Sequence, residues 1–94
     1  KSFVTGFGVN SPMQIHDRRS SADNINEPIP GLLVGGPTKQ ARDDCGEDKY
    51  NSSFDALSYV DLECSYATNE IAINWNASLV FLVHAIEAIN NKNR

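Results

Sequence analysis

The 94-residue sequence predicts an all-α segment with a loop-rich first half followed by one long buried helix. Three observations support this fold class. Gly and Pro recur through the first half of the chain, whereas neither occurs between residues 70 and 90. In that uninterrupted stretch apolar residues lie on every side, as in a helix enclosed by protein. The chain is also too short to enclose such a helix by itself.

The first half, from residue 2 to about residue 58, is expected to form only short elements. Its sequence favours β-like fragments at 2–5 and 32–34 and a brief helical turn at 37–42. The Gly and Pro residues between these fragments prevent any longer periodic element. Loops should therefore dominate this part of the chain.

The long helix is predicted to run from Glu70 to about Asn90. Asn69 is a candidate N-cap, because its side chain can accept a hydrogen bond from an amide of the first turn. Lys92 lies near the negative end of the helix dipole, where a cation is favoured. The preceding loops supply only scattered apolar side chains, so the helix is expected to complete its packing against upstream parts of a larger helical protein.

Composition excludes two classes of partner. The net charge of -4 argues against nucleic acid and against an anionic membrane surface, since both require a dense cationic surface. The longest apolar run, residues 79–83, is far shorter than the roughly 18 residues of a membrane-spanning helix. No secretory signal pattern is visible.

The two cysteines, Cys45 and Cys64, are too few for a structural zinc site, which needs four ligands. Either a disulfide or two free thiols remain possible. A disulfide would close a short loop and contribute about 3 kcal/mol through chain entropy in an oxidising compartment. No metal site is predicted in this segment.

Three ionisable residues stand out by their positions: His16, Asp61 and Glu70. Each also has a structural interpretation: a surface histidine in a local charge cluster, a turn or capping aspartate, and a glutamate favoured by the helix dipole. Asp61 and Glu70 are nine residues apart, about two and a half helical turns, so they would point in opposite directions on one helix. If the two carboxylates converge, Asp61 must lie in a loop.

Two segments resemble signatures of the family 9 glycoside hydrolases, the cellulases and endoglucanases. Residues 2–18 (SFVTGFGVNSPMQIHDR) are similar to the family's histidine signature. The second signature, which holds an active-site Asp and the catalytic Glu, is matched by Tyr59, Val60, Asp61, Tyr66, Glu70, Ala72, Asn76 and Ala77. Residues 28–37 (PIPGLLVGGP) and 73–76 (INWN) are also typical of its bacterial members.

The resemblance implies a role for each matching residue. His16 and Arg18 would bind sugar hydroxyls beside the scissile bond, and Tyr66 would line the same subsite. Asp61 would be the active-site aspartate. Glu70 would be the general acid that protonates the leaving oxygen. The implied substrate is a β-1,4-glucan such as cellulose, and the implied location is extracellular.

The resemblance also implies an incomplete domain. The family is an inverting one built on an (α/α)6 barrel, in which a second carboxylate activates the attacking water. That base lies in an Asp-Ala-Gly-Asp stretch near the family's N-terminus, and the present sequence has no such stretch. The chain thus resembles the C-terminal portion of the barrel over residues 1–94, is expected to be inactive alone, and has the remainder of the barrel as its partner. No cofactor is expected in this segment, although the missing part could bind calcium.

The sequence departs from the family pattern at two positions, and two other functions remain open. Asp17 stands where a second His is usual. Ser78 stands where Pro is usual, which creates a glycosylation sequon at Asn76 that is expected to be buried and unmodified. The alternatives are a non-catalytic carbohydrate-binding or regulatory relative, which need not keep Glu70, and a structural helix that docks on a partner.

Overall fold

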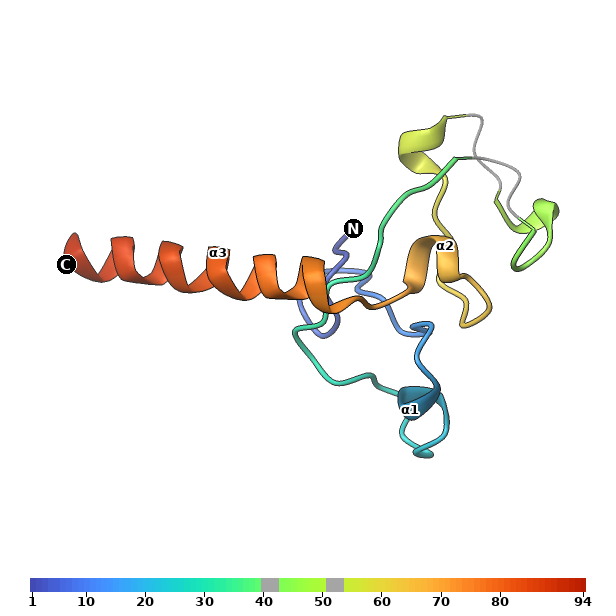
Figure 1. Cartoon of the computed structure of the whole chain (residues 1–94), viewed down its shortest axis with the longest axis horizontal. Helices are drawn as coiled ribbons and strands as arrows, with labels where there is room; N and C mark the ends of the chain where they lie inside the picture. Colours follow the sequence, from blue (N-terminus) through green and yellow to red (C-terminus); the bar gives the residue numbers. More distant parts are fainter. Residues whose placement is uncertain (40–42, 51–53) are drawn as a thin grey trace.

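The computed structural model describes residues 1–39, 43–50 and 54–94 of the chain (Figure 1). Its helical elements are α1 (Arg18–Ser21), η1 (Glu47–Lys49), η2 (Asp55–Leu57), α2 (Tyr66–Asn69) and α3 (Ile73–Lys92). Figure 1 shows α3 as a rod that projects from a group of loops and short turns. The predicted loop-rich first half and single long helix are confirmed.

Two backbone pairings near the start of α3 confirm the expected β-like fragments. Val4 pairs with Leu33, and Val34 pairs with Ile71, both in antiparallel bridges. The helical turn expected at 37–42 is not formed at residues 37–39, and residues 40–42 lie outside the described part of the chain. The two pairings place residues 33 and 34 between the N-terminal segment and the residues that lead into α3.

The long helix begins three residues later than predicted, at Ile73, and its N-cap position is Ala72, whose side chain makes no cap hydrogen bond. Asn69 is the last residue of α2 rather than a cap of α3, and Glu70 has an extended backbone. The reason is tertiary pairing. The Glu70 carbonyl accepts a hydrogen bond from Gly35 N (3.2 Å), and Ile71 forms a bridge, so this backbone is paired with loops before the helix can start.

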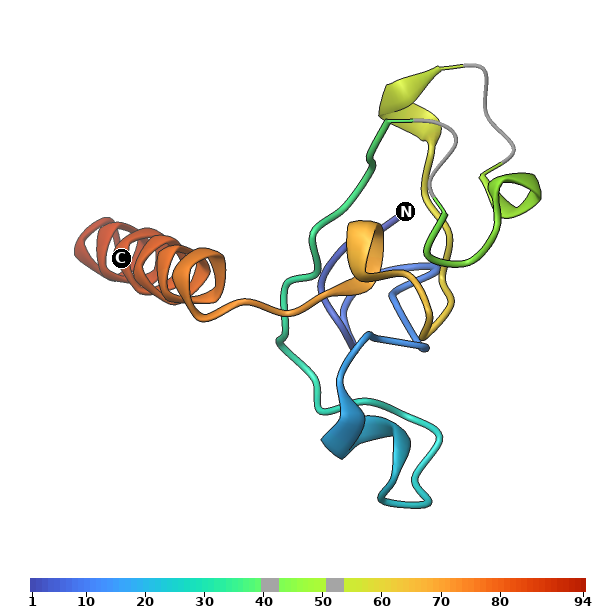
Figure 2. The ribbon, with the colours of Figure 1, turned by 45° about the vertical axis from the view of Figure 1, so that its right-hand side comes forward.

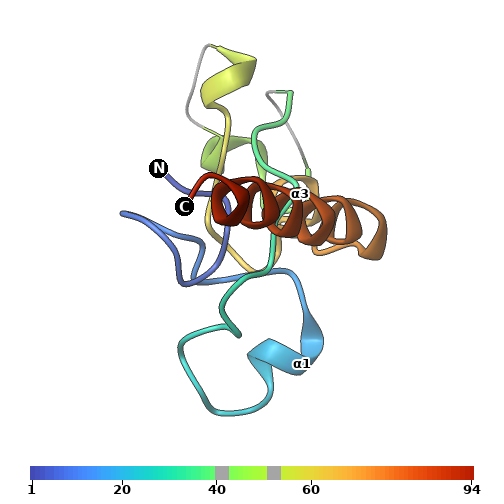
Figure 3. The ribbon, with the colours of Figure 1, turned by 90° about the vertical axis from the view of Figure 1, so that its left-hand side faces the viewer.

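The prediction that this helix is buried is wrong for the chain as it stands. No residue of α3 is buried, and Phe81 is 77% exposed. Figures 1 and 2 show why: the loops gather at the first turns of α3, and the later turns extend beyond them. Figure 3 views α3 from the side of its C-terminal end, with the loops behind it. The exposed large apolar side chains of α3 are Ile73, Val80, Phe81, Leu82, Val83, Ile86 and Ile89.

Two side chains in the first turn of α3 attach the helix to the loops. Trp75 Nε1 donates a hydrogen bond to the Leu33 carbonyl (2.8 Å). Asn76 Oδ1 accepts from Leu33 N (2.8 Å), and its Nδ2 donates to Leu33 O (2.9 Å) and to Ala72 O (3.0 Å). The amide nitrogen of the predicted sequon is therefore already engaged, although Asn76 is half-buried rather than buried.

The small core of the chain is largely polar. Among the described residues, its buried hydrophobic side chains are Ile15, Val34 and Tyr50, and Pro12 and Pro28 are buried as well. The polar residues that are buried in the described part of the chain are Thr5, Ser58, Ser65, Thr68 and Asn69. Because a buried polar group is costly unless it is hydrogen-bonded, the loops around α2 are specified by hydrogen bonds more than by apolar packing.

Candidate active site

The structure brings His16 and Glu70 together, although 54 positions separate them in the sequence. The two residues pair in a parallel bridge, and His16 N donates a hydrogen bond to the Asn69 carbonyl (2.9 Å). The Tyr66 ring stands edge-on to the His16 ring, with 6.3 Å between centroids. All three side chains are exposed. We call His16, Tyr66 and Glu70 the exposed triplet.

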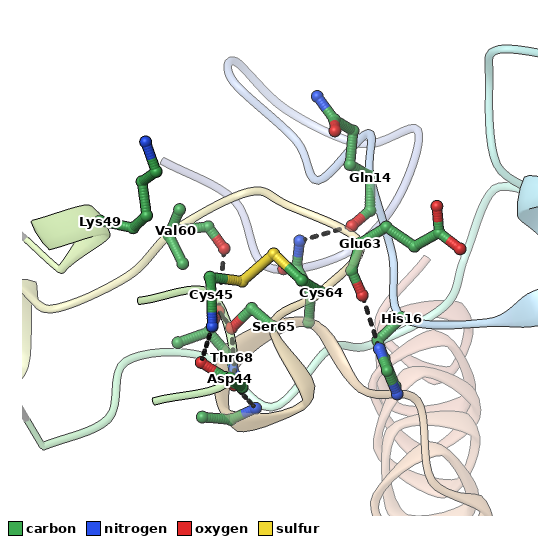
Figure 4. The surroundings of a disulfide bond; sticks show 12 residues. Gln14, His16, Asp44, Cys45, Lys49, Val60, Glu63, Cys64, Ser65 and Thr68 are labelled. Carbon is green, nitrogen blue, oxygen red and sulfur yellow. Dashed lines mark hydrogen bonds between the residues drawn. A yellow bond between two sulfur atoms is a disulfide. The ribbon is translucent and has the colours of Figure 1, made fainter. Parts of the chain in front are cut away.

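The imidazole of His16 has a defined orientation. Its Nδ1 lies 2.5 Å from the carbonyl oxygen of Glu63, in the turn before α2 (Figure 4). A carbonyl oxygen can only accept, so Nδ1 carries the proton of this hydrogen bond. Nε2 is then the ring atom that remains for a ligand.

Asp61 lies in the loop between η2 and α2 and not on a helix with Glu70. It is half-buried, and its two oxygens accept three N–H groups. Oδ2 accepts from Met13 N (2.8 Å), while Oδ1 accepts from Gln14 N (2.9 Å) and from Asn69 Nδ2 (2.7 Å). Asp61 thus contacts both the segment that leads to His16 and the residue that precedes Glu70.

Arg18 opens α1 two residues after His16, and its side chain is exposed. Among the described residues it joins none of the hydrogen bonds around Asp61. The charge cluster near His16 does exist: Arg19 Nε lies 3.4 Å from Asp17 Oδ1. An exposed ion pair of this kind contributes little to stability. The structure therefore places Arg18 close to His16 along the chain, with its exposed side chain outside the hydrogen bonds around Asp61.

The structure contains a buried hydrogen-bond network next to α2 that the sequence did not predict. Tyr50 OH lies 2.6 Å from both Asp44 Oδ1 and Ser65 Oγ, and Ser65 Oγ lies 2.6 Å from Thr68 Oγ1. Asp44 Oδ2 accepts from Ala67 N (2.9 Å), in the first turn of α2. Burial raises the pKa of Tyr50, and the hydrogen bond to Asp44 adds to the rise, so the phenol stays a donor.

One sequence signal could have revealed part of this network. Ser65 is the N-cap of α2, and its side chain accepts from Thr68 N (3.2 Å). Ser is among the preferred N-cap residues, because its side-chain oxygen can accept from a backbone N–H of the first turn. The contacts to Asp44 and Tyr50 have no such local signal, because they join loops far apart in sequence.

Cys45 and Cys64 form a disulfide, with 5.3 Å between their Cα atoms (Figure 4). Of the two possibilities left by the sequence, the structure has the bridge. Cys45 follows Asp44, and Cys64 precedes Ser65, so the disulfide lies at one edge of the buried network. It therefore links the loop that supports α2 to the turn whose carbonyl holds the His16 ring.

The described ranges, residues 1–39, 43–50 and 54–94, contain no group of three or more His, Cys, Asp or Glu side chains suited to a metal ion. Over the same ranges, no helix has the length and apolar character that crossing a membrane requires.

Comparison with known proteins gives consistent matches. Residues 1–83 match the family model of glycosyl hydrolase family 9. The chain is 48% identical over 87 residues to the xyloglucan-specific endo-beta-1,4-glucanase BoGH9A of Bacteroides ovatus, covering 93% of this chain and 14% of the relative. It is 49% identical over 81 residues to Endoglucanase D of Acetivibrio thermocellus, covering 86% of this chain and 11% of the relative.

Solved structures agree with these matches. The Bacteroides ovatus GH9 structure superposes with a TM-score of 0.74 at 47% identity, over 93% of this chain and 14% of that one. The structure of AaCel9A in complex with cellobiose-like isofagomine superposes with a TM-score of 0.77 at 38% identity, over 89% and 16%. The chain thus spans less than a fifth of the length of each of these proteins.

Proposed function

The chain belongs to glycosyl hydrolase family 9, and from this we propose that residues 1–94 form the C-terminal segment of the catalytic domain of an inverting endo-β-1,4-glucanase. The observation that supports the proposal most is the pairing of His16 with Glu70, beside the Tyr66 ring. The names of two relatives, an endo-beta-1,4-glucanase and an endoglucanase, support the reaction class.

In the proposed reaction Glu70 is the general acid. Its exposed carboxyl group donates a proton to the glycosidic oxygen as the bond to the leaving sugar breaks. His16 Nε2 and Arg18 bind hydroxyls of the sugar rings next to that bond, and the exposed face of Tyr66 packs against a ring. The substrate is a β-1,4-glucan such as cellulose.

The base of an inverting reaction comes from another part of the domain. Such an enzyme needs a second carboxylate about 6.5–9.5 Å from the acid, with room between them for a water molecule. We propose that this carboxylate lies in the part of the barrel that the chain does not span, so the segment alone is inactive. The segment itself needs no cofactor, because a carboxyl proton donor and an activated water suffice.

The exposed apolar side chains of α3 support the proposal of an (α/α)6 barrel around this segment, since a helix that is apolar on all sides requires enclosure. The same side chains also suit the alternative of a structural helix that docks on a partner. The two functions can be distinguished at Glu70 and His16. Only the enzymatic function requires these two side chains to lie together.

A chimeric domain tests the proposed function directly. In the Bacteroides ovatus relative, the segment that aligns with this chain is replaced by this chain, and hydrolysis of a soluble cellulose derivative and of xyloglucan is measured from new reducing ends. We expect the chimera to be active, and both this chain alone and the relative without its segment to be inactive. A folded chimera that hydrolyses neither substrate would refute the enzymatic role and favour the docking helix.

The disulfide supports secretion, because such bonds persist mainly in oxidising compartments, and a polymeric substrate lies outside the cell. Replacing both Cys45 and Cys64 by Ser in the chimeric domain is expected to lower the free energy of unfolding by about 3 kcal/mol, given a sequence separation of 19. Urea unfolding with and without reductant measures the loss. The free energy of unfolding of the double variant should not change through this loop when reductant is added. If the double variant and the parent chimera were equally stable without reductant, the bridge would contribute nothing.

A further inference from the structure

Asn69, the residue immediately before Glu70, is fully buried and connects three segments of the chain. Its Nδ2 donates to Asp61 Oδ1 (2.7 Å) and to the Gln14 carbonyl (2.9 Å). Its main-chain carbonyl accepts from His16 N (2.9 Å). An amide nitrogen has two protons to donate, so both donors of this side chain are used.

Tyr59 determines which way the Asn69 amide faces. The Tyr59 hydroxyl donates a hydrogen bond to Asn69 Oδ1, which turns the Nδ2 end toward Asp61 and Gln14. Burial raises the pKa of Tyr59 far above its usual value, and the nearby charge of Asp61 adds to the rise, so the phenol remains protonated. The Tyr59 ring is held edge-on against Phe3, with 5.0 Å between centroids.

Asp61 is the other half of this connection. It accepts backbone N–H groups from Met13 and Gln14, the two residues at the start of the segment that ends in His16. Together, Asp61 and Asn69 hold residues 13–16 through four hydrogen bonds, two to carboxylate oxygens, one from the amide nitrogen and one to the Asn69 carbonyl. Three N–H groups already occupy the two oxygens of Asp61, so this carboxylate is a fixed anchor.

We propose that Asn69 and Asp61 are positioning residues, which hold the segment 13–16 in register with Glu70 so that His16 and the proton donor face the same bond of the substrate, and that Asp61 itself transfers no proton. The inference rests on the proposed function. It gives Asp61 a role different from that of an acid or base, and it gives Asn69 a role where the sequence suggested only a helix cap.

The magnitude of the effect follows from how sharply catalysis depends on geometry. A misplacement of about 1 Å in a catalytic constellation can cost about 100-fold in rate. Asn69→Asp keeps the side-chain shape and the acceptor for Tyr59. It replaces the donor by an oxygen that faces Asp61 Oδ1 and the Gln14 carbonyl, so it should push residues 13–16 away from Glu70.

The test measures kcat, KM and the pH profile in the chimeric domain, with the melting temperature as the check of folding. Asn69→Asp should lower kcat by about 100-fold in a folded protein. The swapped pair, Asn69→Asp with Asp61→Asn, restores one N–H···O bond between the two side chains and should recover at least about tenfold of that loss. Asn91→Asp, the same change at the exposed end of α3, serves as the matched control and should leave kcat unchanged.

Three results would overturn the proposal. Asn69→Asp could lower only the melting temperature, with kcat of the folded protein unchanged, which would make the network merely structural. Asp61→Asn could be as inactive as Glu70→Gln, with no recovery in the swapped pair and a lost limb in the pH profile, which would place Asp61 in the proton transfer. A folded but inactive parent chimera would instead refute the proposed function, and this inference with it.

Discussion

Replacing Glu70 by Gln in the chimeric domain is expected to lower kcat by about 10²–10⁴-fold, the usual contribution of a general acid. The amide keeps the shape of the carboxyl group and can still hydrogen-bond to a sugar, but it cannot give a proton to the leaving oxygen. Binding of a cellodextrin, measured by calorimetry, should therefore change little. The loss should appear in kcat rather than in KM.

Glu63→Gln is the matched control for this experiment. Glu63 is also exposed and also lies next to His16, which it contacts through its main-chain carbonyl rather than its carboxylate. The same chemical change there should leave turnover close to that of the parent. If Glu70→Gln retained ordinary turnover, the proton donor would have to be another residue.

Leu82→Ala in the chimeric domain is expected to lower the free energy of unfolding by about 3–5 kcal/mol, the cost of deleting a well-packed leucine side chain. Leu82 is 54% exposed in this chain, where it lies on the same face of α3 as Ile86 and Ile89, at helical spacing. A loss of this size arises only if other helices cover that face. Urea unfolding monitored by circular dichroism measures it.

Asn91→Ala, near the exposed C-terminal end of α3, provides the comparison for Leu82→Ala and should change the free energy of unfolding by less than about 0.5 kcal/mol. A loss of less than about 1 kcal/mol at Leu82 would mean that this face stays open in the complete domain. The proposed barrel would then have to leave α3 at its surface.

The sequence was most informative where the signal is local. The Gly and Pro residues of the first half and their absence after residue 58 predicted the loops and the single helix. The spacing of Asp61 and Glu70 predicted a loop for Asp61 if the two carboxylates converge, and Asp61 does lie in a loop. Both deductions depend only on helix geometry and on backbone preferences, which act over a few residues.

What the sequence did not predict depends on contacts between distant segments. Helical periodicity continues back to Glu70, yet pairing with His16 and Gly35 keeps that residue extended and starts the helix at Ile73. Asn69 fits the local pattern of a cap, but its side chain is used by Asp61 and Gln14. Single-sequence patterns cannot detect such hydrogen bonds, because each partner is unremarkable in its own neighbourhood.

The expectation that the long helix is buried was wrong for this chain. The reasoning behind it nevertheless identified a helix with more apolar surface than the chain can cover. Within the described part of the chain, the hydrogen bonds that join the loops to α3 lie at its first turn, where Trp75 and Asn76 meet Leu33. The apolar side chains beyond them remain exposed because 94 residues do not provide enough surface to cover them.

The backbone pairings around Glu70 also separate the segments that must keep their length from a segment whose length can vary. The chain leaves the neighbourhood of Glu70 after His16, and Gly35 N later donates a hydrogen bond to the Glu70 carbonyl (3.2 Å). Between these two points, residues 22–27 are all exposed, and the cost of closing a loop rises only slowly with its length. Insertions or deletions there would lengthen or shorten this surface loop while leaving the backbone pairing of His16 with Glu70 in place.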